Sequence, residues 1–403
     1  MDFADSVDEA AYRSQVSAWL RANVPPQHSG TFTEAERLVA ARAWQAKKAA
    51  HGYARISWPV EFGGAGGTAI QQVIFNQEEA EFDVPTGFFG IGLGMCIPTI
   101  QKFASKELQQ RFVGPALRGE QIWCQLFSEP AAGSDIAGLR TRAIPDGDDW
   151  IVNGQKVWTT GAHYSDYGLL LVRSDPAVPK HQGLTMFWLD MKSAGVEVRP
   201  IHQMSGGSDF NEVYLTDVRI PDSQRLGRVG EGWKVALVTL MNERVEGGKD
   251  RGPSIEQVLK LSGAMPHGED VALTDSAFRQ RLALWYVQAE GLRLTRMRTL
   301  TAISRGQTPG HESAIGKLVA ATRLQELTDQ LIELQDQFGL IADPEYAALG
   351  GSVHRDYLHA PGLRIAGGTD EILKNIIAER VLGLPGEIRA DKNIPFKDLP
   401  SGR

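Results

Sequence analysis

The chain has 403 residues, a formal net charge of −7 and 42% hydrophobic residues. This length and composition predict a globular protein of two or three domains with a substantial core. The mild acidic excess argues against nucleic acid as the main partner, because phosphate binding needs a clustered basic surplus.

The two cysteines, Cys96 and Cys124, stand among apolar neighbours and are expected to be buried free thiols. Two cysteines cannot form a disulfide framework, and no His/Cys cluster has metal-ligand spacing, so we expect no metal site. The amino terminus has no basic leader, and no run of about 18 apolar residues predicts a membrane span. These features favour a cytoplasmic protein.

Residues 1–121 are predicted to form an N-terminal helical domain. Apolar residues recur at helical spacing from Asp8 to Val24, and the alanine-rich Thr33–His51 follows. Further helices are expected over 69–82 and 106–117. The glycine-rich run Phe62–Gly67 lacks the strand and helix that flank a dinucleotide-binding loop, and we interpret it as a turn between helices.

Residues 122–228 are predicted to form a small β domain. Asn153-Gly154 suggests a type I′ hairpin between Trp150–Val152 and Gln155–Trp158. Four short runs rich in β-branched or aromatic residues predict further strands, namely Gly168–Val172, Leu184–Leu189, Val196–Arg199 and Glu212–Ile220.

Residues 229–403 are predicted to form a C-terminal helical bundle. Its expected helices are Trp233–Val245, Ser276–Arg305, Glu312–Phe338 and Thr369–Leu382. The second and third of these are long enough to supply half of an antiparallel four-helix bundle.

Three short segments are the most informative part of the sequence: Leu126–Asp135 (LFSEPAAGSD), Lys156–Thr160 (KVWTT) and Ile365–Ile372 (IAGGTDEI). Their order and separation resemble the acyl-CoA dehydrogenase family, FAD-dependent enzymes that desaturate acyl thioesters. The resemblance covers nearly the whole chain. It implies a mainly α fold with an N-terminal helical domain, a central β-barrel or sandwich, and a C-terminal four-helix bundle.

The first two segments suit a flavin. Ser128 offers a hydroxyl, and the amides of Gly133 and Ser134 can approach a phosphate closely because Gly133 has no side chain. In the family, a tryptophan and a threonine matching Trp158 and Thr160 lie beside the isoalloxazine. Taken alone, Trp158 would suit an ordinary sheet core equally well.

The resemblance extends this set of FAD contacts to Gln125 and Phe127, and to Thr369 and Glu371, whose family counterparts touch the diphosphate or the adenosine. Asp370 and Glu371 would also suit the first turn of any helix.

The chain departs from the family pattern in its expected FAD contacts between subunits. Many members carry Arg-x-x-Phe-Gly after the first bundle helix, whereas this chain continues from Gly248 with Lys249–Ile255. A Gly-Gly-x-Gly segment is reduced to Gln335–Gly339. Other residues, or another polypeptide, are therefore expected to complete the FAD site.

The catalytic base is the second departure. Common family members carry a glutamate where this chain has Gly367, although the backbone N–H of Gly367 could still bind the thioester carbonyl. A minority places the base on the first bundle helix, which matches Glu243. Glu243 shares a helical face with Ala236, Thr239 and Leu240, and burial there would raise its pKa toward working pH. The alternative is a surface glutamate like Glu246.

The substrate contacts expected from the resemblance are Ser134, Arg244 and Gly368. For Arg244, a structural ion pair is nearly as plausible as a role beside the substrate.

The sequence therefore predicts an acyl-CoA dehydrogenase that passes electrons to an electron-transfer flavoprotein and assembles as a homotetramer or a hetero-oligomer. Two alternatives remain open. One is a flavin monooxygenase or oxidase on the same fold, which needs no glutamate base. The other is a degenerate partner subunit of a hetero-oligomeric dehydrogenase.

Overall fold

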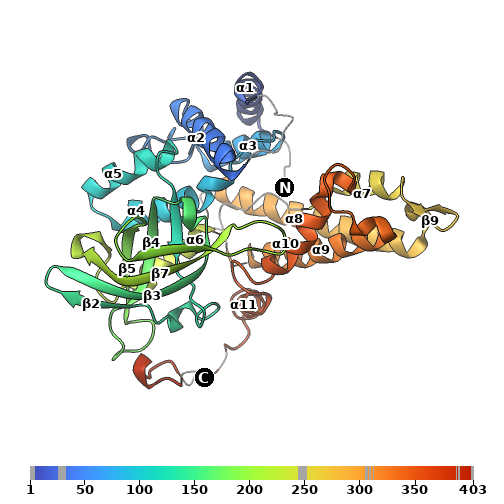
Figure 1. Cartoon of the computed structure of the whole chain (residues 1–403). Coiled ribbons are helices and arrows are strands. Elements are labelled where there is room, and N and C mark those ends of the chain that lie inside the picture. The colour runs from blue at the N-terminus through green and yellow to red at the C-terminus, as the bar shows by residue number, and fades with distance from the viewer. Residues whose placement is uncertain are drawn as a thin grey trace. The chain divides into compact units, whose positions relative to one another are not determined.

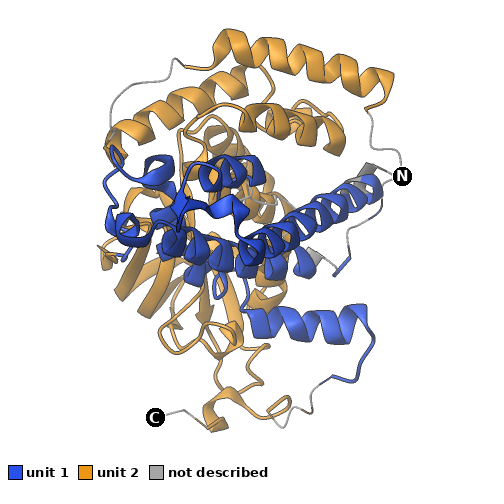
Figure 2. Ribbon diagram, turned by 90° about the vertical axis from the view of Figure 1, so that its right-hand side faces the viewer, with its two compact units in different colours: residues 1–3, 203–207, 248–387 blue, residues 4–202, 208–247, 388–403 orange. Residues whose placement is uncertain are grey.

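A computed structural model describes residues 5–25, 33–243, 252–304, 307, 310–311, 313–386, 388 and 391–400. The chain forms two compact units (Figure 2). Unit 1 contains residues 1–3, 203–207 and 248–387, and unit 2 contains residues 4–202, 208–247 and 388–403. The N-terminal helices, the sheet and the first predicted bundle helix thus share unit 2. The domain boundaries drawn at 121/122 and 228/229 stay predictions.

The helices at the start of unit 2 follow the predicted apolar periodicity. They are α1 (Val7–Asn23), α2 (Glu34–Ala50), α3 (Ala69–Ala80), α4 (Ile97–Phe103) and α5 (Lys106–Leu117). Ser6, Thr33 and Thr68 each begin a helix with a reciprocal capping box, which satisfies two backbone donors at the helix start. The glycine-rich run is a turn, as predicted, with Gly63 and Gly66 at positive φ. Helix α4 and the π-helical turn Gly92–Cys96 before it were not predicted from the sequence.

Unit 2 also contains one large sheet (Figure 1). Its strands are β1 (Trp123–Leu126), β2 (Arg142–Asp146), β3 (Asp149–Thr160), β4 (Tyr167–Arg173), β5 (Leu184–Asp190), β6 (Val196–Pro200), β7 (Phe210–Pro221) and β8 (Arg225–Leu226). Their order is β6-β7-β3-β2-β4-β5-β8, and β1 pairs in parallel with β4. Strands β4 to β7 confirm the four predicted runs.

The predicted hairpin at Asn153-Gly154 is wrong. Both residues lie within β3, at a register shift between Val152 and Gly154 in the pairing with β7. A Cβ at Gly154 would lie 2.3 Å from Oγ1 of Thr141, so this glycine permits close strand packing rather than a turn. The observed hairpin turn is Gly147-Asp148, between Asp146 and Asp149, with Gly147 at φ 63°.

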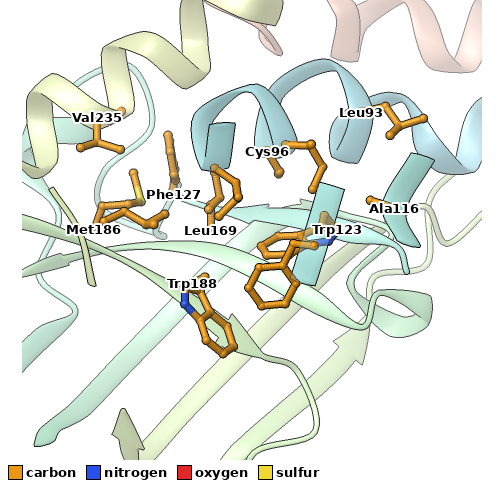
Figure 3. Packing of buried hydrophobic residues seen from close by; sticks show 14 of the residues in the cluster. Leu93, Cys96, Ala116, Trp123, Phe127, Leu169, Met186, Trp188 and Val235 are labelled. Carbon is orange, nitrogen blue, oxygen red and sulfur yellow. The ribbon is translucent and has the colours of Figure 1, made fainter. Parts of the chain in front are cut away.

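The main core of unit 2 lies between the sheet and the helices beside it (Figure 3). Trp123 and Trp188 of the sheet pack edge-on against Phe112 of α5. Helix α6 (Gly232–Glu243) adds Val235 and Ala236 to the same cluster. Cys96 and Cys124 are buried free thiols, as predicted, and burial raises the pKa of Cys124 to about 12.

Over its described residues, unit 1 is mainly helical, with the two-residue strands β9 (Pro266–His267) and β10 (Asp270–Val271). Its helices are α7 (Ile255–Ser262), α8 (Ser276–Ser304), α9 (Ser313–Leu334), α10 (Ser352–Leu363) and α11 (Asp370–Ile376), which a π-helical turn extends over Ile377–Val381. Phe278 and Trp285 of α8 pack with Leu327 and Leu331 of α9 in its core. The sequence analysis missed α7 and α10. None of the described helices is long and apolar enough to cross a membrane.

Candidate flavin and substrate site

The loop that follows β1, residues 127–135, is held against β3 by backbone hydrogen bonds. The amide of Val157 donates to the carbonyl of Ser128 over 2.9 Å. Glu129 and Ala132 exchange two N–H···O bonds of 3.0 Å and so close a tight turn around Pro130. The loop therefore has a fixed path beside the end of β3.

A buried ion pair fixes the same loop from beneath. Lys156 is fully buried, and its ammonium donates to Oε1 of Glu129 at 2.8 Å and to the carbonyls of Phe127 at 3.1 Å and Leu171 at 2.7 Å. Three acceptors match the three N–H groups of a charged ammonium.

The carboxylate of Glu129 also accepts from the amides of Arg140 and Thr141. Burial disfavours its charge, but Lys156 and these donors outweigh burial and hold the pKa of Glu129 below its usual value.

The outer part of the loop offers free donors. Gly133 and Ser134 are exposed, and their amides donate no hydrogen bond to another of the described residues. A Cβ built on Gly133 would meet nothing within 4 Å, so the backbone can be approached closely there. Ser128 and Gln125 are half-buried, whereas the side chain of Phe127 is 2% exposed within the core. Any cofactor contact of Phe127 must therefore use its backbone.

Trp158 has an unusual backbone conformation and an unusual exposure. It lies at φ 59°, where a bulky residue is rare, and 59% of it is exposed. The cause is a β-bulge, because the register with β7 shifts between Lys156 and Thr159. The indole meets Phe210 edge-on at 6.0 Å and Thr160 is also exposed.

The exposed indole face and the loop amides without acceptors fit a flavin and its diphosphate, which need an apolar wall and hydrogen-bond donors. Unit 2 thus brings together Ser128, Gly133, Ser134, Trp158 and Thr160 through the bonds between the loop and β3.

The third segment lies in unit 1, where charged side chains hold its backbone. Gly367 and Gly368 lie at φ 63° and 94°. Lys317 of α9 donates to the carbonyl of Gly368 at 2.6 Å. Arg364 binds Oδ2 of the buried Asp370 through both Nε and Nη2 at 2.7 Å.

The start of α11 provides the other groups that the sequence analysis singled out. Thr369 caps α11 by accepting from the amide of Ile372 at 3.3 Å, and Glu371 is exposed in the first turn. Its own backbone N–H and the Thr369 hydroxyl hold the pKa of Glu371 below its usual value. Among the described residues, the amide of Gly367 has no recorded acceptor, so it is available as a donor.

Helix α6 carries the predicted base at its end. Val235, Ala236 and Thr239 are fully buried, and Glu243, the last residue of α6, follows Thr239 by four positions. Its backbone therefore continues the buried row of the helix. The side chain of Glu243 and all of Arg244 lie outside the described residues.

Three positioning residues were not predicted from the sequence. Glu129 and Lys156 are part of the first two motif segments, but no role was predicted for them. A lysine among apolar strand residues could have indicated a buried ion pair. Lys317, in contrast, lies on a helix whose sequence gives no such signal. No group of three or more His, Cys, Asp or Glu among the described residues is placed to hold a metal ion.

Comparison with known proteins agrees with these observations. Models of the acyl-CoA dehydrogenase N-terminal, middle and C-terminal domains match residues 6–120, 124–218 and 230–382. Acyl-CoA dehydrogenase IpdE1 of Mycobacterium tuberculosis is 34% identical over 391 residues, which are 95% of this chain and 99% of IpdE1. Acyl-CoA dehydrogenase FadE34 of the same organism is 40% identical over 330 residues, 81% of this chain but only 44% of FadE34.

Solved structures show the same fold. The ChsE4-ChsE5 complex from Mycobacterium tuberculosis superposes with a TM-score of 0.78 at 26% identity, covering 96% of this chain and 100% of that one. The Tcur3481-Tcur3483 steroid ACAD has a TM-score of 0.79 at 23% identity over the same shares. The chain belongs to the acyl-CoA dehydrogenase family, whose members are FAD-binding oxidoreductases.

Proposed function

We propose that this chain is an acyl-CoA dehydrogenase that forms a double bond between the α and β carbons of an acyl-CoA thioester. The observation that carries the proposal is the exposed indole of Trp158 beside a fixed loop with unpaired amides. When bound, FAD supplies the acceptor for the hydride that leaves the β carbon. The protein must hold the cofactor, polarise the thioester and remove the α proton.

Each unit offers its own set of proposed cofactor contacts. In unit 2, Ser128 and the amides of Gly133 and Ser134 would donate to the flavin edge and the diphosphate, and Trp158 and Thr160 would lie beside the ring. Gln125 and the backbone of Phe127 complete this set. In unit 1, the N-terminus of α11 with Thr369 and Glu371 is the second proposed cofactor contact.

Glu243 is the proposed base. An α proton is weakly acidic, so its removal needs a polarised carbonyl and a nearby carboxylate. Gly367 has no carboxylate, but its amide can donate to the thioester oxygen. The position of Glu243 on α6, in one row with the buried Ala236 and Thr239, supports this assignment. Arg244, Ser134 and Gly368 are the proposed substrate contacts.

The test is anaerobic stopped-flow reduction of the FAD-loaded protein with a panel of acyl-CoAs. Glu243→Gln should retain the fold and the flavin, because the substitution preserves volume and removes only the ionisable group. Flavin reduction should fall by at least about a hundredfold, the low end for removal of a general base. Glu246→Gln is the matched control and should react like the wild type. An unchanged rate in Glu243→Gln would show that the base is misassigned.

A partner subunit of a hetero-oligomer is the second candidate. The missing Arg-x-x-Phe-Gly stretch favours it, and the ChsE4-ChsE5 structure is a complex of two differently named polypeptides. The exposed apolar side chains Leu284, Val287 and Leu294 along α8 suit a helical interface with another subunit, identical or related. The FAD content per chain distinguishes this candidate from the first. One FAD per chain in a homo-oligomer would contradict it, and flavin bound only in a mixed complex would support it.

An electron-transfer flavoprotein is the proposed electron acceptor, and a cytoplasmic location stays a prediction. The flavin oxidase or monooxygenase alternative predicts rapid consumption of oxygen by the reduced protein. Slow reoxidation by oxygen and fast reoxidation by an electron-transfer flavoprotein would exclude it.

A further inference from the structure

The last part of the chain returns to unit 2 and packs on the loop between β4 and β5. We name residues 391–399 the C-terminal strap. The amides of Phe396 and Lys397 donate to the carbonyls of Val178 and Pro176, both at 2.9 Å, and Pro395 forms an isolated β-bridge with Pro179. The strap lies beyond residue 382, where the match to the family's C-terminal domain ends.

The strap contacts two buried cations, Lys180 and Arg173. The ammonium of Lys180, whose side chain is 7% exposed, lies 2.6 Å from Oδ2 of Asp391 in the strap. The guanidinium of Arg173 lies over the ring of Phe396, 3.7 Å from its centroid. Arg173 also donates to the carbonyl of Lys180 at 2.6 Å, so the two cations are linked.

The same two cations hold the chain that follows the proposed flavin loop. Lys180 lies 2.8 Å from Oδ2 of Asp135, the last residue of the Ser-Glu-Pro motif segment. Arg173 donates to the carbonyl of Ala137 at 2.5 Å and, more weakly, to that of Leu139 at 3.4 Å. Each cation therefore contacts the strap on one side and residues 135–139 on the other.

Because Lys180 and Arg173 are buried charges, their contacts with residues 135–139 depend on the strap. Arg173 is buried, so its guanidinium has lost much of its hydration, and the Phe396 face replaces part of it. This burial lowers the pKa of Arg173 to about 10. Burial also opposes the charge of Lys180, but Asp135 and Asp391 outweigh burial and raise its pKa. Removal of Asp391 would leave Lys180 with one carboxylate in place of two.

We propose that the C-terminal strap is a positioning element of the flavin site: through Lys180 and Arg173 it fixes residues 133–139, and with them the amides of Gly133 and Ser134. This inference rests on the proposed function, because it concerns the loop assigned to the FAD diphosphate. The strap residues touch neither cofactor nor substrate in this scheme. They act through the two cations.

The test uses the full-length variants Asp391→Asn and Phe396→Ala. Asp398→Asn is the matched control, because Asp398 lies in the strap, is exposed and has no recorded side-chain partner among the described residues. The first measurement is hydrogen exchange of the amides of Gly138 and Leu139 in FAD-free protein, because these two amides are hydrogen-bonded within residues 135–139. Exchange should accelerate about tenfold in both test variants and stay unchanged in the control. Asp391→Asn weakens a charge-assisted contact with Lys180, and Phe396→Ala removes a desolvated cation–π contact with Arg173.

The second measurement is the rate at which FAD dissociates from the loaded protein into excess apoprotein of a flavin-binding trap. It should rise about tenfold in the test variants alone. Unchanged exchange in both variants would overturn the proposal, whether or not the protein binds FAD. Faster exchange with unchanged FAD release would overturn the positioning role. A wild-type protein that binds no FAD would instead contradict the proposed function, while the exchange data would still test the strap.

Discussion

The loop after β1 in unit 2 and the loop before α11 in unit 1 each carry proposed cofactor contacts but are built by different means. The loop at 127–135 depends on buried charge: Lys156, fully buried, binds Glu129 and two carbonyls beneath it. The loop at 364–371 also has charged contacts, from Lys317 and Arg364, but it additionally requires a special backbone conformation, with Gly367 and Gly368 both at positive φ. The comparison suggests that the first loop is a rigid support for the cofactor. The second keeps its backbone free of side chains where a thioester would bind.

Removal of Lys156 should have the largest effect. Lys156→Met deletes the ammonium and leaves the Glu129 carboxylate buried beside an apolar chain. Breaking a buried pair in this way costs about 3–5 kcal/mol, so the free energy of unfolding should fall by that amount in urea denaturation. FAD should also be retained more weakly, since Phe127 and Glu129 lose their shared donor.

Two variants sharpen this result. Lys192→Met removes a lysine that is 80% exposed and lies 3.6 Å from Asp166, and it should cost less than about 1 kcal/mol. The double change Lys156→Met with Glu129→Met should recover part of the stability, because no charge is then left buried alone. A loss in Lys156→Met no larger than in Lys192→Met would contradict the idea that buried charge holds this loop.

In the second loop, a single added methyl group at Gly368 should lower the free energy of unfolding. A Cβ at Gly368 would find its nearest neighbour, Cδ2 of Leu373, at 3.7 Å, so Gly368→Ala meets no steric clash. Its cost is the backbone conformation at φ 94°, and we expect a loss of about 1–2 kcal/mol.

Gly316→Ala in α9 is the matched control, because its added Cβ also meets nothing within 4 Å. Within a helix, the same substitution should raise the free energy of unfolding of the protein by about 0.5–1 kcal/mol. Opposite signs in thermal unfolding would confirm that conformation, and not space, makes glycine necessary at 368. Equal effects at both positions would refute this.

Much of the fold could be predicted from the sequence because helical periodicity and caps are local. Ser6, Thr33 and Thr68 begin their helices as capping residues, and the apolar rows of α8 and α9 are long enough to be unambiguous. The failed prediction, Asn153-Gly154, was local as well. Its turn preference was overridden because Gly154 is needed where β3 passes close to Thr141, a contact across the β2–β3 pair that the preference of the dipeptide itself does not reveal.

The proposed site could also be predicted only in part, because its supporting contacts join residues that are distant in sequence. The motifs identified Ser128, Gly133 and Trp158 by type and spacing. They could not show that Lys156 binds the Phe127 carbonyl, that Lys317 binds the Gly368 carbonyl, or that the strap meets Lys180. These contacts join residues from 29 to 211 positions apart in sequence, and they depend on burial that only the folded chain defines.

The smallest expected effect is the most specific to the first loop. At φ 59° every residue except glycine is strained, so Trp158→Ala should keep the strain whereas Trp158→Gly should relieve it. At an ordinary strand position, a protein with glycine is less stable than the same protein with alanine by about 0.5–1 kcal/mol. Relief of about 1–2 kcal/mol of strain should reverse that order at position 158. In denaturant unfolding of the FAD-free protein, the free energy of unfolding of Trp158→Gly should exceed that of Trp158→Ala by about 0.5–1 kcal/mol.

Ile144 of β2 provides the control, because it is 52% exposed and has an ordinary backbone conformation. Ile144→Ala should be more stable than Ile144→Gly. Both Trp158 variants should lose FAD faster than the wild type, since neither has an indole to place against the flavin. If the two variants at 158 follow the order seen at 144, the bulge is not strained, and the exposed indole needs another explanation. If the order reverses while FAD retention falls, the chain maintains a strained backbone at the one position where the indole is presented to the cofactor.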